Sequence, residues 1–174
     1  METATAKSYN IATGLIGELS HEAATTKKIL ERIPAEMFDY KPHEKSMTMI
    51  RLAAHVAEMV DWVADTCTKD EIDFAAGDYK PFEPKTTAEL VEYHDQLVIK
   101  ATEALKNTSD EDMHKPWTLK SGEHIIFTMT KIATLRTMCM NHIWHHRGQL
   151  SVYLRLNDIP VPSIYGPSAD EGQM

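Results

Sequence analysis

The sequence predicts an all-α fold, a four-helix bundle, with a short β-hairpin before the last helix. Four segments of the 174-residue chain repeat apolar residues at intervals of three and four, the spacing that buries one face of an α-helix. Prolines and turn residues lie between and after these segments. A chain of this length commonly forms one domain, and four amphipathic helices in so short a chain commonly pack as a bundle. We therefore expect residues 1–174 to form a single four-helix domain.

The first two helices are predicted on either side of a proline. Apolar residues recur at helical spacing over about residues 8–32, and Pro34 ends this run because proline cannot continue a helix. The second helix starts near Ser46 or Thr48, since either hydroxyl is suited to accept a hydrogen bond from a free N–H of the first turn. Its apolar pattern continues to about Thr66.

The third helix follows a segment that is predicted to be a loop. Residues 70–85 contain Gly77 and two prolines, which interrupt regular structure. Thr87 is suited to cap the helix that runs from there to about Lys106. The residues predicted to face inward on this helix are Leu90, His94, Leu97 and Ala101.

The fourth helix is predicted over about residues 127–157, and Pro160 prevents its extension. Before it, Ser121 and Gly122 form a turn signal between two short segments, residues 117–119 and 124–126. Two such segments around a glycine-containing turn favour a β-hairpin.

The composition narrows the class of protein. The formal net charge is −8 and Lys and Arg form no cluster, whereas a nucleic-acid-binding surface would be basic. The only cysteines, Cys67 and Cys139, lie far apart in helical patterns, which suits a reducing compartment. No N-terminal leader pattern and no run of about 20 apolar residues is present. We expect a cytoplasmic protein that binds neither nucleic acid nor membrane.

His142 and His146 are the most informative residues of the chain. They are one helical turn apart, so both imidazoles rise from the same face and can close on one metal ion. They continue an apolar seam that is predicted to face the core, and histidines hydrogen-bonded inside a core are the alternative interpretation. Bundles take metal ligands from facing helices, and His55 in the second helix is the best third ligand. The predicted seam is Ile132, Leu135, Cys139, His142, His146, Gln149 and Tyr153.

Three segments, spread over nearly the whole chain, carry a resemblance to the DinB-like (DinB/YfiT) metalloenzyme family. They are Ile33–Pro42 with the helix bearing His55, the segment His142–Gln149, and the tail Asn157–Gly166. The resemblance implies that His55, His142 and His146 hold one divalent metal ion, which is Zn, Ni, Fe or Mn. It also implies a homodimer. Ligand histidines must be neutral, so the metal affinity should fall below about pH 6 to 6.5.

The resemblance implies the site more firmly than the reaction. Three histidines leave a coordination position open, as in catalytic metal sites. Some members of the wider family resemble S-transferases that use a low-molecular-weight thiol, and many have no assigned reaction. We therefore expect a metal-binding protein and take transfer of a small thiol onto a small electrophile as the first hypothesis. A metal-dependent hydrolase that uses metal-bound water and a non-catalytic metal-binding or stress protein are the alternatives.

Four neighbours of the predicted ligands have open roles. Glu58 is interpreted as a solvent-facing charge, with metal ligation or support of His55 as alternatives. Arg147 is expected to pair with an acidic residue of another helix, and substrate binding is its alternative. Gly148 is expected to allow close packing of another segment, and Gln149 to hydrogen-bond a ligand histidine or a backbone carbonyl.

Overall fold

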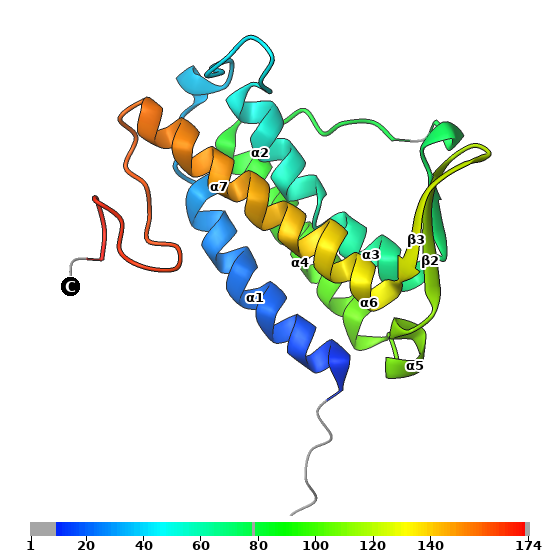
Figure 1. The fold of residues 1–174 in the computed structure, drawn as a ribbon. Helices are drawn as coiled ribbons and strands as arrows, with labels where there is room; N and C mark the ends of the chain where they lie inside the picture. The colour runs from blue at the N-terminus through cyan, green and yellow to red at the C-terminus, as the bar shows by residue number, and fades with distance from the viewer. Residues whose placement is uncertain (1–9, 78, 173–174) are drawn as a thin grey trace, which may run out of the picture.

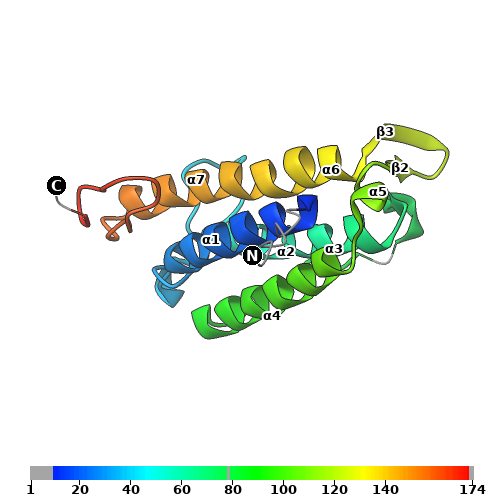
Figure 2. The same ribbon diagram turned by 90° about the horizontal axis from the view of Figure 1, so that it is seen from below.

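A computed structural model describes residues 10–77 and 79–172, and its architecture is a four-helix bundle with a small sheet at one end (Figures 1 and 2). The predicted fold class is confirmed. None of the helices in the described ranges is long and apolar enough to span a bilayer. The bundle is formed by α1 (Ile11–Leu30), α2 (Met49–Glu58) with α3 (Asp61–Thr68), α4 (Thr87–Lys106), and α6 (Lys131–Thr134) with α7 (Asn141–Leu156).

The second predicted helix is divided into two. Thr48 caps α2, because its hydroxyl accepts a hydrogen bond from the N–H of Arg51 at 3.3 Å. At the far end the N–H of Val60 bonds to the carbonyl of Ala57 at 3.2 Å, three residues back rather than four. This tighter turn ends α2 at Glu58 and starts α3 at Asp61. Two shorter helices therefore replace the single one that the pattern predicts.

The fourth helix begins at Lys131 rather than near residue 127. The preceding residues continue the hairpin as a strand, and the hydroxyl of Thr130 caps the helix by accepting a hydrogen bond from the N–H of Ala133. Between α6 and α7 the helix adopts a π-helical segment, η3 (Leu135–Met140). A π-helical turn contains more residues than an α-helical turn, so it changes which face the residues that follow present.

The predicted hairpin is confirmed and is longer than expected. It consists of β2 (Pro116–Ser121) and β3 (His124–Thr130), which are antiparallel and are joined by a two-residue turn. Gly122 occupies the first turn position with φ +60°, a conformation that glycine adopts without strain.

The segment that was predicted to be a loop contributes to the same sheet. Its residues β1 (Glu71–Asp73) pair in parallel with β2, giving the strand order β1-β2-β3. The carboxylate of Asp73 accepts a hydrogen bond from the N–H of Gly122 at 2.8 Å, which joins β1 to the hairpin turn. The loop prediction is therefore wrong at this point. Three further short helices are η1 (Ala35–Met37) after α1, η2 (Phe74–Ala76) after β1 and α5 (Asp110–Met113) before β2.

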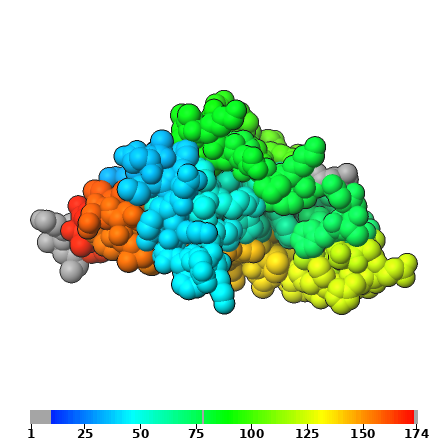
Figure 3. All heavy atoms as spheres, turned by 90° about the horizontal axis from the view of Figure 1, so that it is seen from above, coloured from blue at the N-terminus to red at the C-terminus, as the bar shows by residue number. Residues whose placement is uncertain are grey.

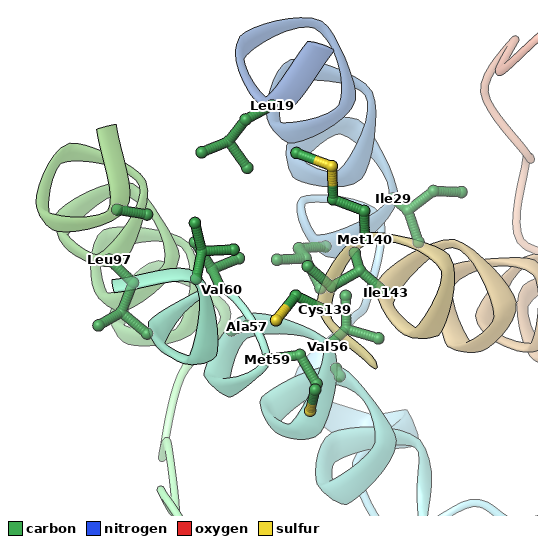
Figure 4. Packing of buried hydrophobic residues seen from close by; sticks show 14 of the residues in the cluster. Leu19, Ile29, Val56, Ala57, Met59, Val60, Leu97, Cys139, Met140 and Ile143 are labelled. Carbon is green, nitrogen blue, oxygen red and sulfur yellow. The ribbon is translucent and has the colours of Figure 1, made fainter. Parts of the chain in front are cut away.

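The hydrophobic core draws side chains from all four long helical segments (Figure 4). Leu19 of α1, Leu97 of α4, Val60 before α3 and Ile143 of α7 converge there, and each such side chain contributes about 1.5–3 kcal/mol on burial. The core also packs α2 against α7. In the space-filling view the residues of α2 and the segment before it (light blue to cyan) lie between the orange part of α7 and the green α4 (Figure 3). This packing brings the second helix alongside the histidines of the last.

Candidate metal centre

The three histidines predicted as metal ligands meet between α2 and α7. The Nε2 atom of His142 lies 2.7 Å from Nε2 of His146 and 3.4 Å from Nε2 of His55. One ligand atom from each histidine lies within 4.8 Å of the others, although His55 and His142 are 87 residues apart in the sequence. All three side chains are half-buried, so the cluster is sheltered and still reached by solvent.

The donor set fits a divalent transition metal. Three imidazole nitrogens about 2.0–2.1 Å from one tetrahedral ion lie about 3.3–3.4 Å from one another. The separation of 3.4 Å between His55 and His142 matches this value, and the separation of 2.7 Å between His142 and His146 requires these two rings to move apart slightly. Zn²⁺, Ni²⁺ and Fe²⁺ accept imidazole ligands readily, and Mn²⁺ accepts them more weakly. In the described part of the chain no fourth His, Cys, Asp or Glu joins the group.

Two of the three imidazoles already have a hydrogen-bonding partner behind them. Nδ1 of His146 lies 2.7 Å from Oε1 of Gln149, and the backbone of Met138, in the π-helical segment, forms a hydrogen bond with His142. A partner that accepts from Nδ1–H fixes the tautomer in which Nε2 carries the free lone pair. The predicted hydrogen bond between Gln149 and one of the three histidines is thus present, although the Gln149 side chain is exposed and not on a buried seam.

The imidazoles are held in the neutral form. Burial, with smaller effects of the same sign from His146, His142 and Arg51, lowers the pKa of His55 to about 4, while the Glu58 carboxylate acts in the opposite direction. Burial also lowers the pKa of His142, with additional effects from His146. The pKa of His146 is lowered for the same reason, although its hydrogen bond to Gln149 partly offsets the decrease. A neutral imidazole is the form that binds a metal ion.

Glu58 does not face solvent, which corrects its predicted role. Only 6 % of the residue is exposed, and its carboxylate accepts hydrogen bonds from Arg51 at 3.0 Å, from the hydroxyl of Tyr79 at 2.9 Å and from the N–H of Phe82. Its Oε2 atom lies 3.9 Å from Nδ1 of His55. Arg51 was not among the residues predicted for the site, although its position seven residues before Glu58 places both on one helix face.

Arg147 has the structural role that was expected. It is 1 % exposed, and its guanidinium lies 2.7 Å from the carboxylate of Glu22 in α1. It also donates to the hydroxyls of Thr26 and Tyr165. The expectation for Gly148 is wrong, because a Cβ atom at that position would meet nothing within 4 Å.

The remaining histidine in a helix core, His94, is separate from the cluster. It is 1 % exposed in α4, as its position in the apolar pattern predicts, and neither ring nitrogen has a hydrogen-bond partner among the described residues. It lies outside the group formed by His55, His142 and His146. Burial lowers the pKa of His94, so this imidazole is a neutral part of the core.

Comparisons with known proteins agree with the fold. A sequence model of the DinB family matches residues 8–173. The Bacillus subtilis protein YrdA is 25 % identical over 150 residues, which cover 86 % of this chain and 85 % of YrdA.

Two solved structures have the same fold. The DinB-like protein YjoA from Bacillus subtilis superposes with a TM-score of 0.68 at 20 % identity, covering 87 % of this chain and 96 % of YjoA. A DinB-like protein from Bacillus cereus ATCC 10987 also gives a TM-score of 0.68, at 23 % identity, covering 90 % of this chain and 98 % of the other.

Proposed function

Because this chain belongs to the DinB family, which its match over residues 8–173 establishes, we propose that it binds one divalent metal ion through His55, His142 and His146. We propose further that the ion activates a low-molecular-weight thiol for transfer onto a small electrophile. The observation that supports both steps is the convergence of three neutral imidazoles in a half-buried site without a fourth ligand among the described residues.

The residues of the site have separate tasks in this proposal. A divalent cation held by three neutral imidazoles supplies a Lewis acid with an open position, which favours the deprotonated form of a thiol near neutral pH. His55, His142 and His146 hold the ion and, being uncharged, leave its positive charge uncompensated. Gln149 and the backbone of Met138 keep two of these rings oriented. All three histidine side chains are only half-buried, so solvent-borne thiol and electrophile would have access to the cluster.

Thiol consumption tests the reaction. Purified protein loaded separately with Zn²⁺, Ni²⁺, Fe²⁺ or Mn²⁺ is mixed with common cytosolic thiols and a panel of small electrophiles. We expect faster loss of free thiol with at least one ion, and a return to the uncatalysed rate when a chelator removes it. Failure of every thiol and electrophile pair would contradict the transferase proposal.

The same assay separates the transferase from the alternatives. Turnover of an ester or amide without added thiol would indicate a hydrolase, and stoichiometric metal without any turnover would indicate a non-catalytic metal-binding protein. A hydrolase assisted by Glu58 receives little support, because that carboxylate is engaged with Arg51 and Tyr79 on the Nδ1 side of His55.

We also propose that the protein is a homodimer. Sedimentation velocity of the metal-loaded protein tests this oligomeric state.

The lowered pKa values predict metal binding that resists mild acid. Ordinary histidines would lose metal below about pH 6.5, because protons compete with the ion. Here burial, followed by His146, His142 and Arg51, lowers the pKa of His55 to about 4 against the opposing effect of Glu58. We expect the dissociation constant, measured by titration calorimetry, to change little between about pH 7.5 and about pH 6 and to rise only at lower pH, because each pKa lies below its ordinary value. A steep rise that already starts at about pH 6.5, as for ordinary histidines, would contradict this.

A further inference from the structure

Each ligand ring has a polar group on the side away from the cluster, and only one of these groups is charged. Gln149 stands behind His146 and the backbone of Met138 behind His142. Behind His55 stands Glu58, three residues later in α2, with Oε2 at 3.9 Å from Nδ1. The spacing along one helix places both side chains on the same face. His55 directs Nε2 at His142 and therefore turns Nδ1 toward Glu58.

The burial of Glu58 requires an explanation beyond its contacts with the following loop. A buried carboxylate is costly unless it is paired and hydrogen-bonded. Arg51 supplies one cation to pair with the carboxylate. The other two donors, the hydroxyl of Tyr79 and the N–H of Phe82, are neutral, and the single side-chain oxygen of a glutamine at position 58 could accept a hydrogen bond from one of them. A negative charge is useful where an imidazole N–H becomes a stronger donor, as happens when the other ring nitrogen binds a metal ion.

We propose that Glu58 is the positioning residue of the metal centre, accepting a hydrogen bond from Nδ1–H of His55 in the metal-bound protein. The distance of 3.9 Å shortens by about 1 Å when this bond forms, since charge-assisted N–H···O bonds are about 2.7–2.9 Å long. Hydrogen bonds from Arg51, Tyr79 and Phe82 hold the carboxylate of Glu58 in place. Through Glu58 they connect the loop that carries Tyr79 and Phe82 to the imidazole of His55. This role rests on the proposed metal site at His55, His142 and His146.

The test compares cobalt(II) binding by the wild-type protein, Glu58→Gln and Tyr79→Phe. Glutamine keeps the shape of Glu58 and one acceptor oxygen for the loop, but removes the charge that faces His55. We expect Glu58→Gln to weaken cobalt(II) binding about tenfold to a hundredfold and to shift the visible absorption bands of the bound ion. The matched control Tyr79→Phe removes one hydrogen bond between the loop and Glu58, keeps the charge, and should weaken binding less than threefold.

A second measurement uses the wild-type protein alone and so does not depend on the folding of a variant. In protein loaded with Zn²⁺, the Nδ1–H proton of His55 should give a downfield NMR signal that exchanges slowly with water. Equal cobalt(II) affinity and equal spectra in wild type and Glu58→Gln would overturn the role of Glu58 alone, as would rapid exchange of that proton. Failure of the wild-type protein to bind cobalt(II) would overturn this role together with the proposed function.

Discussion

Replacing His142 and His146 together by alanine should abolish metal binding. Wild-type protein is expected to retain close to one divalent ion per chain in elemental analysis after reconstitution, and the double variant to retain none. The physical reason is that the replacement leaves His55 as the sole imidazole of the cluster, and one imidazole does not hold an ion tightly at neutral pH. The double variant should remain folded, since both side chains are only half-buried.

His124→Ala is the matched control for this experiment. His124 is an exposed histidine in β3 and lies outside the cluster, so its loss should leave the metal content unchanged. Metal that persists in the double variant would refute the three-histidine site. Absence of metal from the wild type after reconstitution would return these histidines to a role in packing.

Replacing Glu22 by glutamine should destabilise the protein by about 3 kcal/mol, because it leaves the guanidinium of Arg147 buried without its counter-charge. Glutamine can still accept a hydrogen bond, so the effect reports mainly the loss of charge. Urea unfolding followed by circular dichroism measures the change in the free energy of unfolding. Metal affinity should change little, since neither Glu22 nor Arg147 is a ligand.

The double variant Glu22→Leu with Arg147→Met tests the electrostatic origin of this loss. Replacing both members of a buried ion pair by apolar residues of similar size is often close to neutral. We therefore expect the double variant to be more stable than Glu22→Gln. A double variant that is less stable than the single one would indicate that hydrogen bonds of Arg147 to Thr26 and Tyr165 dominate instead.

The helices were predictable because their signals are local. Thr48 and the apolar faces act within a few residues, and the pair His142 and His146 owes its proximity to one helical turn. The π-helical segment was not predictable in this way, because a helical pattern does not encode the extra residue in a turn. It lies within the predicted seam, along which Gln149 is exposed rather than inward.

The surroundings of Glu58 illustrate a second limit. One of its hydrogen bonds comes from the backbone N–H of Phe82, which is 24 residues away, and every residue except proline carries such a group. Residue type therefore gives no sign of the contact. Strand β1 was missed for a related reason: a three-residue strand is too short for an alternating pattern, and its pairing with β2 depends on a distant segment.

The proposed ligands lie in near and distant parts of the chain, which gives the proposed site an order of assembly. His142 and His146 are four residues apart and need only one formed turn of helix to offer two nitrogens to an ion. His55, 87 residues earlier, joins them only when the loop between the two helices has been closed, which costs chain entropy. An ion bound by all three histidines would thus cross-link α2 to α7 and would bind fully only after these helices have packed together. During synthesis, the complete set of three histidines is available only after α7 has been made.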